Sequence, residues 1–540
     1  MNNIMVLDVT LRDGGCVNEF NFGQENIDRI IEAQEKVGID IVEVGYLDDN
    51  NGALYGKTQY LNENVILENV IKHKNNNSKY VAMVDYGKFN VKKMKERTAE
   101  GIDGIRLAFH KKDYFNIIQI GKQILEKGYE LYIQPMITLR YTDDELLELI
   151  ELVNENLSAS KALYIVDSFG EMRQNDVRRI VNIVEQNLLS EIAVGFHSHN
   201  NLQLSYANAI SLLENRAKRD LIIDCSIMGM GKGAGNLNTE LILNHLNLFF
   251  GKQYKIGPLL NVIDNVIKPI FSEFYWGYAP EYYLSAINQC SPTYASFFYN
   301  KHMLTIDQIS ELLKMINPHK KISFDREYAE SLYKKYNERT AVDDRSAIEK
   351  LKNDLNEKTV LLIAPGKSIG EKIEEIEKKS SCENVITIGL NTFLPFNKYV
   401  LITRKELYES HNVSNGMKII CSNISGDTSK NDIVLDYRNW VEEKGIICDS
   451  ATVIIFNILK KCNVKGVIMA GFDGYSLNIN DNYYDSNMKH AFSIKEIEEV
   501  NMFYKQYFYE IRKGGIKIEF ITPSIYDENC EEYGRLLNIN

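Results

Sequence analysis

The feature that most constrains the fold is a regular alternation over roughly the first 250 residues of short apolar runs with amphipathic stretches. In stretches such as 143–156, apolar residues recur at i, i+3 and i+4, which indicates helices between the apolar runs. Eight strand–helix units in a segment of this length are typical of a (β/α)8 barrel. The predicted strands are 4–9, 39–45, 80–84, 104–109, 130–137, 162–167, 192–199 and 221–228.

Polar side chains follow several of these predicted strands. In a (β/α)8 barrel the chemistry takes place at the carboxyl ends of the strands, so side chains at those ends meet at one rim. We therefore expect a single site built from the ends of strands one, two, six and seven and from the glycine-rich loop after strand eight. The residues concerned are Arg12, Asp13, Glu43, Ser168, His197, His199 and the loop 231–236.

Three of these residues predict a divalent-metal site. His197 and His199 are two positions apart on a strand, so their side chains point to the same side. Together with Asp13 they offer two nitrogens and one oxygen, a set suited to Mn²⁺, Mg²⁺, Fe²⁺ or Zn²⁺. A metal held there with open positions can polarise the carbonyl group of a 2-oxo acid.

Arg12 and Glu43 are the predicted catalytic pair. A guanidinium fixed in a dry site would stabilise an enolate oxygen, and Arg12 is also the expected contact for the substrate. The alternative is a structural ion pair of Arg12 with Asp8 or Glu43. Glu43 itself has three candidate roles: holding Arg12, orienting a water molecule, or binding substrate.

Four separated motifs resemble the DRE-TIM metallolyases: residues 8–15, Glu43, the His197-Ser198-His199 pair and the loop 231–236. That superfamily includes hydroxymethylglutaryl-CoA lyase, isopropylmalate and homocitrate synthases and 4-hydroxy-2-oxovalerate aldolase. The resemblance covers roughly residues 1–300 and is greatest to the aldolase. It implies a metal-dependent aldolase that uses Mn²⁺ or Mg²⁺ and acts on a pyruvate-type 2-oxo acid and an aldehyde. It also implies Asn236 as a further metal ligand, Ser168 as a substrate contact, and a homodimer.

The predicted general base departs from the aldolase pattern. Those aldolases carry a histidine three residues after the metal aspartate, whereas this chain has Cys16. A cysteine needs a lowered pKa to act as a base, so His110, Tyr141 and a metal-bound water remain candidates. The loop 228–231 lacks the cysteine of hydroxymethylglutaryl-CoA lyase, which argues against that activity. An acetyl-CoA-dependent Claisen synthase remains the alternative.

Beyond residue 250 the sequence predicts two further parts. Residues 251–351 are expected to form a helical extension over the barrel, with a capping box at 305–308. The charged stretch 352–358 is the predicted linker, and residues 359–540 are predicted to form a second, Rossmann-like α/β domain with an open, mostly parallel sheet. Its predicted strands are 359–364, 385–389, 399–403, 417–421, 464–470 and 516–522.

Two glycine-containing turns resemble parts of nucleotide-binding motifs. The loop 229–234 fits G-x-G-x-x-A, but it follows the eighth strand rather than the first strand of a βαβ unit, so NAD binding is rejected there. Gly366, Lys367 and Ser368 form half of a P-loop and weakly resemble the first turn of hydroxymethylpterin diphosphokinase-like and sialyltransferase-like domains. A phosphate or nucleotide site and a plain packing turn are both open. A third hypothesis therefore places the function in a nucleotide- or sugar-nucleotide-binding transferase domain at 359–540.

Composition excludes several classes of partner and compartment. The net charge of -12 argues against nucleic acids and anionic membrane surfaces, because both attract clustered Lys and Arg. No apolar run approaches the length of a transmembrane helix, and the first strand does not read as a signal peptide. The eight cysteines show no C-x-x-C spacing, which favours reduced thiols. We expect a cytoplasmic protein.

Overall fold

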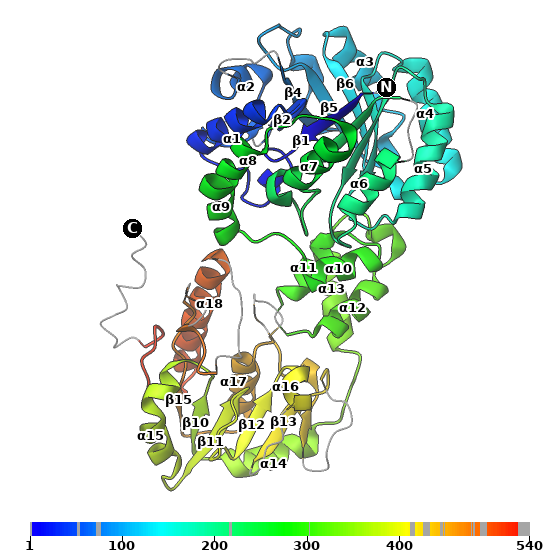
Figure 1. Ribbon diagram of the computed structural model, residues 1–540. Coiled ribbons are helices and arrows are strands. Elements are labelled where there is room, and N and C mark those ends of the chain that lie inside the picture. Colours follow the sequence, from blue (N-terminus) through cyan, green and yellow to red (C-terminus); the bar gives the residue numbers. More distant parts are fainter. Residues whose placement is uncertain are drawn as a thin grey trace. The chain divides into compact units, whose positions relative to one another are not determined.

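The computed structural model describes residues 3–50, 55–71, 77–214, 219–301, 303–410, 416–424, 432–442, 447, 449–476, 478, 481–485 and 494–527 (Figure 1). Residue contacts divide the chain into two compact units. The first contains residues 1–295 and 321–323, and the second contains residues 296–320 and 324–540.

The first unit is a closed parallel barrel, which confirms the predicted (β/α)8 fold. Its strands run in the order β1, β9, β8, β7, β6, β5, β4 and β2, and pairing of β1 with β2 closes the ring. A short ninth strand, β3 (Gln59–Tyr60), adds to β2. The eight barrel strands are β1 (Ile4–Asp8), β2 (Ile41–Leu47), β4 (Lys79–Asp85), β5 (Gly104–Phe109), β6 (Glu130–Pro135), β7 (Ala162–Asp167), β8 (Ala193–Ser198) and β9 (Leu221–Cys225).

Alternation along the strands separates the barrel interior from the surrounding helices. Leu7, Ile41 and Ile222 belong to a core inside the ring, whereas Val6 and Val42 belong to the larger core against the helices. Because side chains alternate, Glu43 lies on the same face of β2 as Ile41, and therefore inside the ring. The helices of this unit are α1 (Gln24–Val37), α2 (Glu63–Asn69), α3 (Ile117–Glu126), α4 (Asp143–Asn156), α5 (Gln174–Asn187), α6 (Ser205–Glu214), α7 (Thr239–Phe250), α8 (Ile256–Val262), α9 (Lys268–Glu273) and α10 (Pro280–Ile287).

The boundary between the units differs from the prediction. It falls within helix α11 (Pro292–Tyr299) rather than at residue 250 or in the stretch 352–358. Residues 352–355 end helix α14 (Arg345–Leu355), and Leu351 and Leu355, four residues apart, are fully buried in the second unit's core. The charged residues that suggested a linker are therefore the outer face of an amphipathic helix.

The rest of the predicted helical extension lies in the second unit as helices α12 (Ile306–Met315) and α13 (Arg326–Asn337). The predicted capping box is present: the Thr305 hydroxyl accepts from the Gln308 amide nitrogen, and the Gln308 side chain accepts from the Thr305 amide nitrogen.

The second unit contains an open sheet in which every strand pair is parallel. Its order is β14, β13, β12, β11, β10, β15 and β16, so β10 lies between the second strand of the domain and a strand that comes much later in the chain. The strands are β10 (Thr359–Ile363), β11 (Val385–Leu390), β12 (Tyr399–Ile402), β13 (Met417–Cys421), β14 (Ile433–Leu435), β15 (Gly466–Ala470) and β16 (Ile518–Phe520). Six were predicted, and β14, only three residues long, was not.

Helices cover both faces of this sheet. Val360 and Leu362 belong to a core with α14, α17 (Ala451–Lys461) and α18 (Ile494–Lys513). Leu361 and Ile363, on the opposite face, pack with residues of α15 (Ser368–Ser380), and a third cluster includes α16 (Lys405–Ser410). The three-layer arrangement is that of a doubly wound α/β domain. Among the helices of the described residues, none is both long and apolar enough to cross a membrane.

Candidate metal centre

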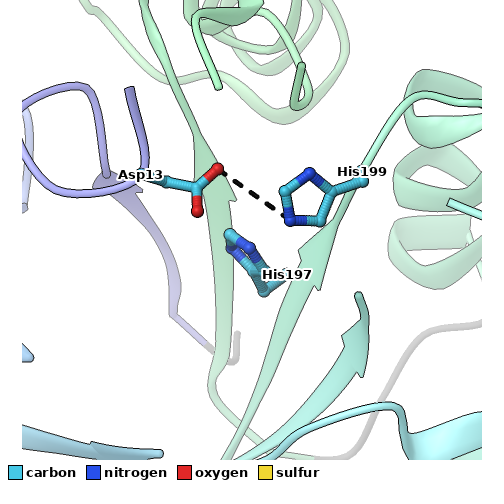
Figure 2. A group of neighbouring side chains, drawn as sticks. All are labelled: Asp13, His197 and His199. Atoms are coloured by element: carbon cyan, nitrogen blue, oxygen red, sulfur yellow. Dashed lines mark ion pairs between the residues drawn. The ribbon is translucent and has the colours of Figure 1, made fainter. Parts of the chain in front are cut away.

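Asp13, His197 and His199 converge at the carboxyl-end rim of the barrel. Asp13 follows β1, His197 is near the end of β8, and His199 comes directly after it. Figure 2 shows the three side chains turned toward a common point, and one ligand atom from each lies within 4.8 Å of the others. All three residues are buried, and His199 Nε2 is 3.9 Å from Asp13 Oδ2.

Hydrogen bonds to both histidines leave the same nitrogen open. His197 Nδ1 is 2.9 Å from Asp224 Oδ2, and His199 Nδ1 is 3.1 Å from the carbonyl oxygen of Lys232. Both oxygens are acceptors, so each Nδ1 carries the proton and each Nε2 presents a lone pair. Burial lowers the pKa of His199 to about 4, so its imidazole is neutral at physiological pH.

Asn236, the further metal ligand that the family resemblance implies, contacts this cluster. Its Nδ2 donates to Asp13 Oδ2 at 2.7 Å and to the Met230 carbonyl at 3.2 Å, whereas its buried Oδ1 has no hydrogen-bond partner among the described residues. The loop approaches closely because residue 231 is glycine: a Cβ there would lie 2.3 Å from Asn236 Nδ2. Asn236 thus contacts the Asp13 carboxylate through its nitrogen and has an unpaired oxygen, the kind of donor that a divalent cation takes.

Arg12 is held by two carboxylates. Its Nε donates to Glu43 Oε2 and its NH1 to Asp13 Oδ1, both at 2.7 Å. The partner is therefore Glu43 rather than Asp8, whose oxygens accept from Thr10, Gln34 and Thr239. Holding Arg12 was one of the roles expected of Glu43, and the geometry brings these two side chains together.

A second buried arginine extends this network. Arg106 in β5 is completely buried and donates to Glu43 Oε2 at 2.7 Å and to Asp224 Oδ2. Since Asp224 also bonds His197, an unbroken chain of contacts connects Arg12 to a predicted metal ligand. Sequence reasoning missed both Arg106 and Asp224. The signal was available, because each is a charged residue within an otherwise apolar strand, and such residues are seldom buried without a partner.

The network carries an unbalanced charge. Two cations, Arg12 and Arg106, face three carboxylates, those of Asp13, Glu43 and Asp224. Burial alone would raise the pKa of Asp13, but Arg12 and the two histidines hold it well below its usual range. One negative charge therefore remains uncompensated inside the barrel, which favours a bound cation.

The three candidate side-chain bases differ in protonation. Although the Cys16 surface is exposed, desolvation by the surrounding protein raises the pKa of its thiol to about 12. Burial raises the pKa of Tyr141 well above its usual range, whereas burial and Lys112 lower that of His110. At neutral pH His110 is the one of these three with a ring nitrogen that carries no proton and can accept one.

Ser168, the predicted substrate contact, follows β7. Its hydroxyl oxygen accepts from the amide nitrogen of Ile137 at 3.0 Å. Neighbouring Asp167 accepts from two backbone amides, and burial raises its pKa to about 7. Ser168 thus supports the loop after β6, and its substrate role stays a prediction.

The predicted phosphate turn is occupied by acidic side chains. Ser368 donates through its amide nitrogen to Asp473 Oδ2 at 2.8 Å, and its hydroxyl contacts the same carboxylate. Lys367 forms an ion pair with Asp481. An anion at the first turn of α15 would therefore meet Asp473.

Comparison with known proteins places the barrel in a family. A family model described as HMGL-like matches residues 3–249. A 4-hydroxy-2-oxovalerate aldolase from Chloroflexus aurantiacus is 30% identical over 274 residues, covering 49% of this chain and 75% of the relative. The chain belongs to the HMGL-like family.

A second 4-hydroxy-2-oxovalerate aldolase and one solved structure are also similar to this chain. A 4-hydroxy-2-oxovalerate aldolase from Bacillus thuringiensis is 27% identical over 270 residues, which cover 49% of this chain and 76% of that protein. The solved structure of the Bacillus subtilis HMG-CoA lyase aligns with a TM-score of 0.39 and 13% identity, over 50% of this chain and 93% of that one. The HMGL-like match ends at residue 249, outside the second unit.

Proposed function

We propose that the barrel is a divalent-metal-dependent aldolase that makes or cleaves a carbon–carbon bond through the enolate of a pyruvate-type 2-oxo acid, with an aldehyde as the other reactant. The observation that carries the proposal is the convergence of Asp13, His197 and His199 beside Arg12. The names of the relatives, 4-hydroxy-2-oxovalerate aldolases, support this reaction class.

The donor set supports Mn²⁺ or Mg²⁺ as the cofactor. Asp13, His197 and His199 would hold the ion, and the orphaned Oδ1 of Asn236 is the fourth donor. When bound, such a cation supplies Lewis-acid polarisation of the keto oxygen of a 2-oxo acid. The negative balance of the surrounding network favours a divalent ion over an empty site.

Arg12 is the group that stabilises developing negative charge. Its guanidinium is buried and fixed by Glu43 and Asp13, so it is already oriented when the enolate oxygen forms. Glu43 acts through Arg12 rather than on the substrate, because its Oε2 is shared between Arg12 and Arg106.

His110 is our candidate for the base that moves the proton of the aldol hydroxyl. It follows β5 at the same rim, and it is the candidate side chain that can accept a proton at neutral pH. Cys16, which stands where the aldolase pattern has histidine, keeps its proton in that pH range.

Cleavage of a 4-hydroxy-2-oxo acid tests the proposal. Pyruvate release from racemic 4-hydroxy-2-oxovalerate, followed by reduction with lactate dehydrogenase, is expected with Mn²⁺ or Mg²⁺ and not after chelation. His199→Ala should abolish release, and excess metal should not restore it. Turnover that survives both chelation and His199→Ala would refute the proposal. Thiol release from acetyl-CoA in the presence of a 2-oxo acid would instead identify a Claisen synthase.

A further inference from the structure

The second unit has a pocket at the point where its strand order reverses. From β10 the sheet continues through β11, β12, β13 and β14 on one side and through β15 and β16 on the other. The carboxyl ends of β10 and β15 therefore flank a topological switch point. In doubly wound sheets ligands bind in the crevice outside the strands at this point.

The pocket has about 1120 Å³ of empty space, including the part open to solvent at its mouth. Its walls are the loops after β10, β11, β12 and β15, the first turn of α17, and parts of α18 and the chain near residue 301, all within the second unit.

Acidic side chains exclude a bare anion from one side of the pocket. Asp473 caps the first turn of α15, and Asp449, which is 5% exposed, accepts from the Tyr437 hydroxyl at 3.0 Å. Both carboxylates line the pocket. Inorganic phosphate would be repelled by these two carboxylates. Most of the binding free energy of a ligand must therefore come from contacts with other residues of the pocket.

Other residues of the lining are aromatic or basic. Phe472, Tyr475 and Tyr483 line the pocket, and the two tyrosines are partly exposed, so a planar ligand would contact aromatic side chains there. Arg404 also lines it, in an ion pair with Glu406 and with 28% of its side chain exposed. The first turn of α17, which begins at Ala451, also lies at the pocket, but it directly follows Asp449, and the Ser450 hydroxyl already accepts from the Val453 amide nitrogen.

We propose that this pocket binds a nucleoside phosphate, with the base among the tyrosines and the phosphate toward Arg404. The side chains of Asn391 and Thr403, which bond each other at 3.0 Å, form the polar wall that would face the ribose. This places the phosphate at Arg404 rather than at the predicted α15 turn, where Asp473 already lies. It is independent of the aldolase reaction.

Titration calorimetry on the full chain tests the proposal. The ligands are the four common nucleoside monophosphates and diphosphates, the matching nucleosides and inorganic phosphate. We expect at least one nucleotide to bind with a Kd of about 1 mM or tighter, the matching nucleoside more weakly, and phosphate not detectably. Absence of binding for every nucleotide would overturn the proposal.

Variants locate the site. Ala451→Trp fills the pocket and should weaken nucleotide binding about tenfold or more, a loss of about 1.4 kcal/mol, whereas Glu374→Trp, on an exposed position of α15, should have no effect. Arg404→Ala should reduce the affinity for the nucleotide to that for the nucleoside. If Ala451→Trp fails to fold, Arg404→Ala is the variant that tests the location of the site. Binding that is lost in Arg12→Ala but retained in Ala451→Trp and Arg404→Ala would place the nucleotide in the barrel and refute the inference.

Discussion

Replacing Asp224 with asparagine tests whether the buried network prepares the metal site. Asp224 Oδ2 accepts from His197 Nδ1 at 2.9 Å and also bonds Arg106. Asparagine keeps the size of the side chain but removes the charge, so the five ionised groups change from a net single negative charge to neutrality. The His197 imidazole also loses the carboxylate that fixes its proton on Nδ1 and increases the basicity of Nε2.

Loss of such a supporting carboxylate typically lowers metal affinity by about 10–100-fold, which corresponds to about 1.4–2.8 kcal/mol. The assay is titration calorimetry of the metal-free protein with Mn²⁺. The control is Asp264→Asn, which removes an exposed carboxylate paired with Lys268 and should leave the affinity unchanged. If Asp224→Asn folds and binds Mn²⁺ within twofold of the unmodified protein, the network does not prepare the site, and this account of it is wrong.

Three further outcomes follow from the barrel. Arg12→Ala should lower the rate of pyruvate release by about 10²–10³-fold while Mn²⁺ still binds in calorimetry; an equal loss of binding would make Arg12 a structural residue. Arg106→Met removes the positive charge that Glu43 and Asp224 face, and it should destabilise the protein by about 3–5 kcal/mol. The Tm should fall by about 10 °C. A Tm within 2 °C of that of the unmodified protein would contradict a stabilising role for these buried ion pairs. The raised pKa of Asp167 means that the folded state binds more protons than the unfolded state between about pH 4 and 7, so this carboxyl group reduces stability as pH rises through that window. In Asp167→Asn the free energy of unfolding should fall less between pH 5 and 8 than in the unmodified protein, and identical pH profiles in denaturant titrations would refute this.

The barrel was predictable because each strand–helix unit repeats the same periodicities. The apolar runs of period two and the helical stretches of period 3.6 are local, so eight strands could be counted from the chain alone. The 352–358 stretch was misjudged for the opposite reason. Its charges are local, but the packing of Leu351 and Leu355 that makes it part of a helix depends on the second unit's core.

The site, too, could be predicted only in part from the sequence. Asp13, His197 and His199 could be proposed from motif and spacing, because strand ends bring them to one rim. Arg106 and Asp224 stand out in the sequence as charged residues within apolar strands, but their partners do not, because the contact between them crosses the ring and joins residues 118 positions apart. The partner of Ser368 was also invisible, because Asp473 reaches it from a loop 105 residues later.

Hydrogen–deuterium exchange at the methyl group of pyruvate tests the central claim most directly, because enolate formation needs no knowledge of the aldehyde. Proton NMR in D₂O would follow loss of the methyl signal with Mg²⁺ or Mn²⁺, with chelator, and for Arg12→Ala, with 2-oxobutyrate as a second substrate. The account predicts exchange that requires the metal and is weakened by Arg12→Ala. No exchange from either acid with either metal present would contradict it.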